Sequence, residues 1–133
     1  MLARIAIFIA APLSAGPGVP AVPNDARLQG CCFYAPDLPK PAGGESRLGC
    51  TDVTIEGGTI IFSNSEWGPT GTFSGIWQGD NMVVERFAAR RQQAEQARGS
   101  CHIWHNDGAI SAVACTAATR GRSWVANFLT SRI

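Results

Sequence analysis

Five cysteines are the residues of this chain whose type and spacing point most directly to a chemistry, which is disulfide formation. They are Cys31, Cys32, Cys50, Cys101 and Cys115. The last two bracket a predicted hairpin, so we expect them to bond to each other, and we expect Cys50 to bond Cys32 or Cys31. Because five is an odd number, one thiol is left free or bonds to another chain, which would give a disulfide-linked dimer.

A metal site is the next chemistry to consider, because Cys101, His102 and His105 crowd into one short run. On an extended strand Cys101 and His105 share a face but lie about 13 Å apart, at roughly 3.3 Å per residue. His102 then points the other way, so one ion cannot be held by all three. We therefore expect no metal site and no other cofactor.

Enzymatic catalysis finds little support in the sequence. No Gly-x-Ser-x-Gly nucleophile elbow occurs, and a Cys–His pair would need the one unpaired thiol. We assign no catalytic residue and expect a protein that is not an enzyme. A small secreted hydrolase or a thiol enzyme is the alternative.

Four tryptophans suggest a recognition role. Trp77 and Trp124 sit inside apolar alternation, which predicts core positions. Trp67 lies in a predicted turn and Trp104 near a hairpin tip, where exposed aromatic side chains often mark a binding surface. The tip itself, His105 to Asp107, is included in this predicted surface.

Arginines concentrate in the C-terminal part of the chain, and two of them complete the predicted site. On a helix, Arg86 and Arg90 would share one face, four residues apart. Such a face is usually solvated, and the alternative is a docking surface for an anionic partner. The formal net charge of the whole chain is only +1, which argues against a nucleic-acid partner.

The N-terminal residues are typical of an export signal: Arg4 precedes a short apolar run, and small residues follow. This run is too short to cross a bilayer, which needs roughly 20 apolar residues. We expect a signal peptide over residues 1–21, cleaved near residue 15 or 21, and no transmembrane segment. The mature protein would then be periplasmic or secreted.

After the signal, residues 22–49 are rich in proline and glycine, which predicts a linker and a disulfide-tethered loop. Residues 50–133 alternate polar and apolar side chains, which indicates half-buried strands. Gly57-Gly58 and Asp107-Gly108 are strong hairpin turns between such strands. The fold class is therefore mainly β, an antiparallel sheet closed as a small barrel or stacked as a sandwich.

One segment, residues 82–98, is ambiguous. It lacks glycine and proline and is dense in Ala, Arg, Gln and Glu, which favours a helix over about 84–98. Its first residues also have the composition of a strand, so an all-β fold is the alternative.

Together these observations predict a small exported, disulfide-stabilised, non-enzymatic domain that binds a protein or glycan of the cell envelope. The alternatives are the small enzyme named above and a structural subunit linked by an intermolecular disulfide.

Overall fold

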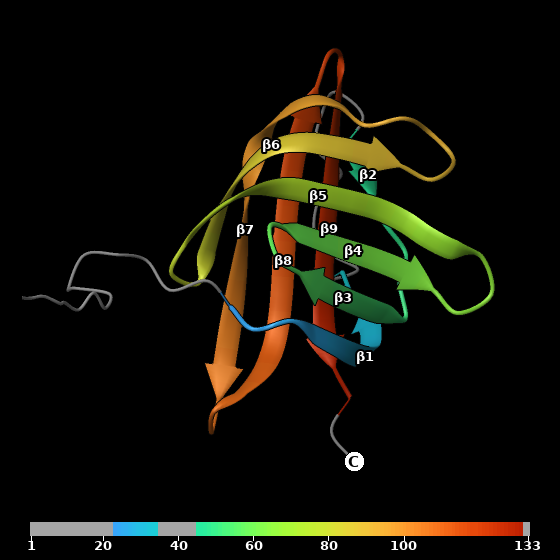
Figure 1. Cartoon of the computed structure of the whole chain (residues 1–133). Coiled ribbons are helices and arrows are strands. Elements are labelled where there is room, and N and C mark those ends of the chain that lie inside the picture. The colour runs from blue at the N-terminus through green and yellow to red at the C-terminus, as the bar shows by residue number, and fades with distance from the viewer. Residues whose placement is uncertain (1–22, 35–44, 132–133) are drawn as a thin grey trace, which may run out of the picture.

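The computed structural model describes residues 23–34 and 45–131, which form an antiparallel β-barrel (Figure 1). The strands are β1 (Ala26–Cys32), β2 (Glu45–Arg47), β3 (Asp52–Glu56), β4 (Thr59–Asn64), β5 (Gly68–Gln78), β6 (Asn81–Ala89), β7 (Glu95–Asn106), β8 (Ala109–Thr119) and β9 (Arg122–Thr130). The expected signal peptide, 1–21, lies outside the described residues, as do residues 35–44 of the expected loop.

Eight of these strands close into a ring. Each strand from β3 to β9 pairs with the next one along the chain, and β1 pairs with both β3 and β9. The ninth strand, β2, adds in parallel to the start of β9. The prediction of a mainly β, antiparallel fold is confirmed, and the barrel is the form that it takes. Both β1 and β2 precede Cys50, so the barrel includes part of the segment expected as linker and tethered loop.

The helix expected over about 84–98 is wrong, and the all-β alternative is confirmed. These residues instead complete β6, turn at Arg91, where φ is 59°, and begin β7. Helix propensity is a weak preference that tertiary context overrides. Here Val84, Phe87 and Ala97 are buried in the barrel interior, and both strands gain hydrogen-bonded neighbours on either side.

Aromatic rings fill much of the interior. Phe62 meets Phe73 edge-on with centroids 5.4 Å apart, and Phe73 lies 4.8 Å from Phe87. Phe87 reaches Trp124 on β9, with centroids 5.0 Å apart, so this contact crosses the barrel. All four rings are buried, and such pairs add to the stabilisation from area burial alone.

Two disulfides cross-link the barrel. Cys101 bonds Cys115, which is the predicted pair, and Cys50 bonds Cys32 rather than Cys31. The thiol of Cys31 is free and exposed.

The connections between strands define the two ends of the barrel (Figure 1). The β4–β5, β6–β7 and β8–β9 connections lie together at one end, which we call the β8–β9 end. The β3–β4, β5–β6 and β7–β8 connections lie at the opposite end, which we call the β7–β8 end.

Candidate functional site

The structure divides the predicted binding residues between the two ends of the barrel. Trp67 and Arg90 lie at the β8–β9 end, in the β4–β5 and β6–β7 connections. Trp104, His105 and Asp107 lie on the β7–β8 hairpin at the other end. The predicted residues therefore do not form one surface.

At the β8–β9 end, the guanidinium group of Arg90 lies 5.3 Å from the centre of the Trp67 ring, and 60% of Trp67 is exposed. Arg86 lies further along β6, where its Nη2 donates a hydrogen bond of 3.1 Å to the carbonyl of Ala94. Because β6 is a strand, the helix face expected to join Arg86 and Arg90 does not exist. Arg86 instead ties the strand to the β6–β7 connection.

Near the β7–β8 end, a surface groove of about 530 Å³ runs between Trp104 and Leu129. Trp104 on β7 pairs with Ala112 on β8, and Ala112 pairs in turn with Leu129 on β9. A small side chain between two large ones leaves room above the middle strand. We call this feature the Trp104 groove; its lining residues are Trp104, His105, Asn106, Ser111, Ala112, Leu129 and Thr130.

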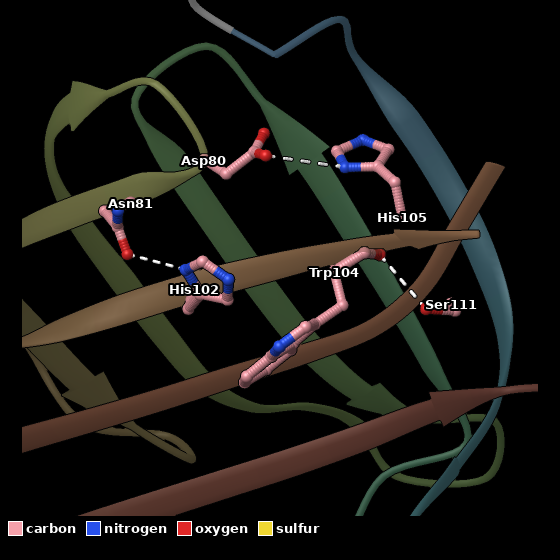
Figure 2. Close-up of polar contacts among 6 residues, drawn as sticks. All are labelled: Asp80, Asn81, His102, Trp104, His105 and Ser111. Atoms are coloured by element: carbon pink, nitrogen blue, oxygen red, sulfur yellow. Dashed lines mark hydrogen bonds and ion pairs between the residues drawn. The ribbon is translucent and has the colours of Figure 1, made fainter. Parts of the chain in front are cut away.

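His102 supports the wall of the Trp104 groove (Figure 2). Its ring meets the indole of Trp104 edge-on, with centroids 4.4 Å apart. Its Nδ1 lies 2.6 Å from Oδ1 of Asn81. Because an amide oxygen only accepts, Nδ1 carries the hydrogen and donates it. In the neutral ring, Nε2 is then left as an acceptor. His102 is thus fixed from β6 while it contacts Trp104.

His105 points to a different neighbour, Asp80 in the β5–β6 connection (Figure 2). The distance from Nδ1 of His105 to Oδ2 of Asp80 is 3.6 Å, and both side chains are about half exposed. Exposed pairs of this kind contribute little stability. A second hollow of about 400 Å³ adjoins the pair, and Asp25 and Ile110 also line it. His105 lines both this hollow and the Trp104 groove.

Asp107 has a structural role that accounts for its residue type. It occupies the β7–β8 turn with φ at 55°, and Gly108 follows with φ at 81°. Two successive positive φ angles are what a tight two-residue hairpin turn requires, and aspartate tolerates them better than most residues.

The outer face next to the Trp104 groove includes further residues outside the predicted binding set. Cys31 on β1 is level with Leu129. Phe33 is 52% exposed, and its backbone exchanges hydrogen bonds with Asn127 on β9. The alternation of side-chain directions along β9 could have predicted that Leu129 faces outward, because its neighbour Phe128 faces the interior. The pairing of β1 with β9 is a long-range contact that no local pattern indicates.

Among residues 23–34 and 45–131, no three or more His, Cys, Asp or Glu side chains are grouped so that they could hold a metal ion. Within the same part of the chain, no helix has the length and hydrophobicity to span a bilayer.

Comparisons of the chain with protein-family models, with curated proteins and with solved structures found no match.

Proposed function

We propose that this protein is an exported, non-enzymatic binding domain that receives a protein partner in the Trp104 groove. The observation that carries this proposal is the exposure of the Trp104 indole together with its contact to His102. The indole is 46% exposed, yet the ring of His102 fixes one side of it. A large aromatic ring held rigid beside a groove is the arrangement that dominates binding energy in many protein interfaces.

The chemistry of the Trp104 groove favours a protein partner over a glycan. Trp104, Ala112 and Leu129 supply apolar surface in a line across three strands. The polar residues His105, Asn106, Ser111 and Thr130 also line the groove, and Ser111 uses its hydroxyl to donate from Oγ to the Trp104 carbonyl at 3.3 Å. An apolar side chain of a partner would cover the line of Trp104, Ala112 and Leu129 and displace water, whereas a sugar on that line would leave hydroxyl groups facing alanine and leucine.

Export is the other part of the proposal. Two intramolecular disulfides stabilise the barrel, and such bonds persist in oxidising compartments. With the signal-like residues 1–21, they support a periplasmic or secreted protein. Mass spectrometry of the protein recovered from cells tests this: we expect a new N-terminus near residue 16 or 22 and both disulfides intact. A full-length chain with reduced cysteines would contradict export.

Site-specific crosslinking tests the groove. A photoreactive phenylalanine analogue at position 129 should capture a protein partner in intact cells, and the same analogue at position 92, an exposed glutamine, is the control at the β8–β9 end. Equal capture at both positions, or none at position 129, would count against the groove.

Substitutions then test the role of Trp104. Trp104→Ala should weaken binding of the captured partner by at least about 30-fold, since hot-spot side chains contribute about 2 kcal/mol or more. Trp67→Ala is the matched control, because it removes an exposed tryptophan from the other end of the barrel. If an envelope glycan binds the wild-type protein and Trp104→Ala abolishes that binding, the glycan replaces the protein as partner.

A second candidate function rests on Cys31. Its free thiol is exposed and is level with Leu129 at the edge of the Trp104 groove. The barrel could therefore serve as a structural subunit joined through Cys31 to another chain. Non-reducing electrophoresis should then show a dimer that Cys31→Ser abolishes, while the two internal disulfides remain.

A further inference from the structure

The two ends of the barrel carry opposite charge. Six arginines lie at the β8–β9 end, on β2 and on the strand ends and connections there: Arg47, Arg90, Arg91, Arg98, Arg120 and Arg122. Four acidic residues belong to the strands and connections of that end, namely Glu45, Asp52, Glu66 and Glu95, so the arginines exceed them by two. We call the six arginines the arginine rim.

The opposite end is acidic. Four exposed carboxylates lie there: Asp25, Glu56, Asp80 and Asp107. Arg27 is the one arginine close to them among the described residues, which leaves an excess of three negative charges. The net charge of the chain is close to zero, but its positive and negative charges are separated between the two ends and form an electric dipole along the barrel.

Aromatic rings hold three arginines of the rim in place. The guanidinium carbons of Arg47, Arg90 and Arg122 lie 5.6, 5.3 and 5.0 Å from the ring centres of Tyr34, Trp67 and Trp124. An arginine that is already ordered loses less conformational entropy when it meets an anion. Trp67 differs from the other two rings because it is largely exposed in the β4–β5 connection.

An extended anionic surface fits these observations better than a small anion does. The rim is spread over β2 and two connections on different sides of the barrel mouth, and these lie at one end of the molecule (Figure 1). A charged plane acts on the whole dipole: it attracts the arginine rim and repels the acidic end, and so selects one orientation. Trp67 then adds a residue that prefers the boundary between water and lipid.

We infer that the β8–β9 end docks on the surface of an anionic lipid membrane, with Trp67 entering the headgroup region. This site is independent of the Trp104 groove, which lies toward the other end of the barrel. A barrel docked in this way would present its β7–β8 end and the groove to the aqueous side.

Vesicle binding tests the inference with the disulfide-bonded protein. Vesicles of equal parts phosphatidylglycerol and phosphatidylcholine should bind it, and vesicles of phosphatidylcholine alone should not. Binding should weaken as salt is added, because the Debye length is only about 10 Å at 0.1 M and shortens further. Tryptophan emission should shift to the blue on binding, and Trp67→Ala should remove that shift.

Charge variants locate the contact. Arg120→Gln combined with Arg91→Gln should weaken vesicle binding by about tenfold or more, since each basic residue near an anionic membrane contributes about 1 kcal/mol. Arg27→Gln, outside the rim, is the matched control and should leave binding unchanged. Circular dichroism and a non-reducing peptide map confirm that each variant folds.

Three results would overturn the inference: equal binding to both kinds of vesicle, an equal loss for Arg27→Gln and the rim variant, or binding to a soluble polyanion such as heparin with none to vesicles.

Discussion

Cys101 and Cys115 face each other directly across β7 and β8, with their Cα atoms 4.0 Å apart and both side chains inside the barrel. The bond thus joins two neighbouring strands at a buried level of the core. It closes a loop with a sequence separation of 14 residues.

Removing this disulfide should destabilise the protein. In the chain-entropy account, a bond that closes a loop of this size stabilises the folded state by about 3 kcal/mol. We expect the Cys101→Ala, Cys115→Ala double variant to lose about that much free energy of unfolding, measured by urea denaturation. Cys31→Ala is the control and should unfold at the wild-type urea concentration. An unchanged midpoint for the double variant would show that the bond does not constrain the unfolded chain.

Gly30 should be required for closing the barrel. It pairs with Thr130, and a Cβ at this position would overlap the Leu129 carbonyl oxygen. Gly30→Ala should therefore force β1 away from β9 and cost about 1–3 kcal/mol, the usual penalty for overpacking. Hydrogen exchange at the amides of 128–131 should accelerate.

Gly49→Ala is the matched control for Gly30→Ala. A Cβ at position 49 would have no heavy atom within 4 Å, so this variant should keep wild-type exchange and stability. Similar losses in both variants would mean that the effect comes from the backbone of glycine rather than from the contact with β9.

Trp77 should stabilise the barrel through its indole nitrogen as well as its bulk. The side chain is buried, and its Nε1 donates a 2.6 Å hydrogen bond to the carbonyl of Gly57 in the β3–β4 turn. Trp77→Phe retains an aromatic ring but removes the donor, and should cost about 1–3 kcal/mol in thermal or urea unfolding. Trp67→Phe, at an exposed position, should change stability by less than about 0.5 kcal/mol.

Replacing a buried and an exposed phenylalanine by alanine should have very different effects on the free energy of unfolding. Phe73 is fully buried between Phe62 and Phe87, and Phe73→Ala should cost about 3–5 kcal/mol because it opens a cavity. Phe33→Ala at an exposed position should be nearly neutral for stability. If Phe33→Ala instead unfolds the protein, the outer face near β1 contributes to the fold and is not simply a surface.

Local patterns in the sequence predicted those parts of the fold that depend on neighbouring residues. The Asp107-Gly108 turn sets the register of β7 and β8, and that register brings Cys101 opposite Cys115. The same alternation separates the buried Trp77 and Trp124 from the exposed Trp67 and Trp104.

Contacts between distant residues account for what the sequence could not predict. The pairing of β1 with β9 joins Cys31 to Leu129, nearly the whole length of the domain apart. Residues 84–98 have a composition that favours a helix. As strands, however, they bury Val84 and Phe87 inside the barrel, and this burial outweighs the helix propensity. The predicted site failed as one surface for a related reason, because Trp67 in the β4–β5 connection and Trp104 near the end of β7 lie toward opposite ends of the barrel.

The second edge of β9 is occupied along its length. β2 covers 123–125, β1 covers 128–130, and the carbonyls of Val125 and Asn127 accept hydrogen bonds from the amides of Leu48 and Phe33. A protein with so little net charge has weak electrostatic repulsion between its own copies in solution. Covering this edge leaves no free side of β9 on which a foreign strand could pair, which disfavours edge-to-edge association between copies.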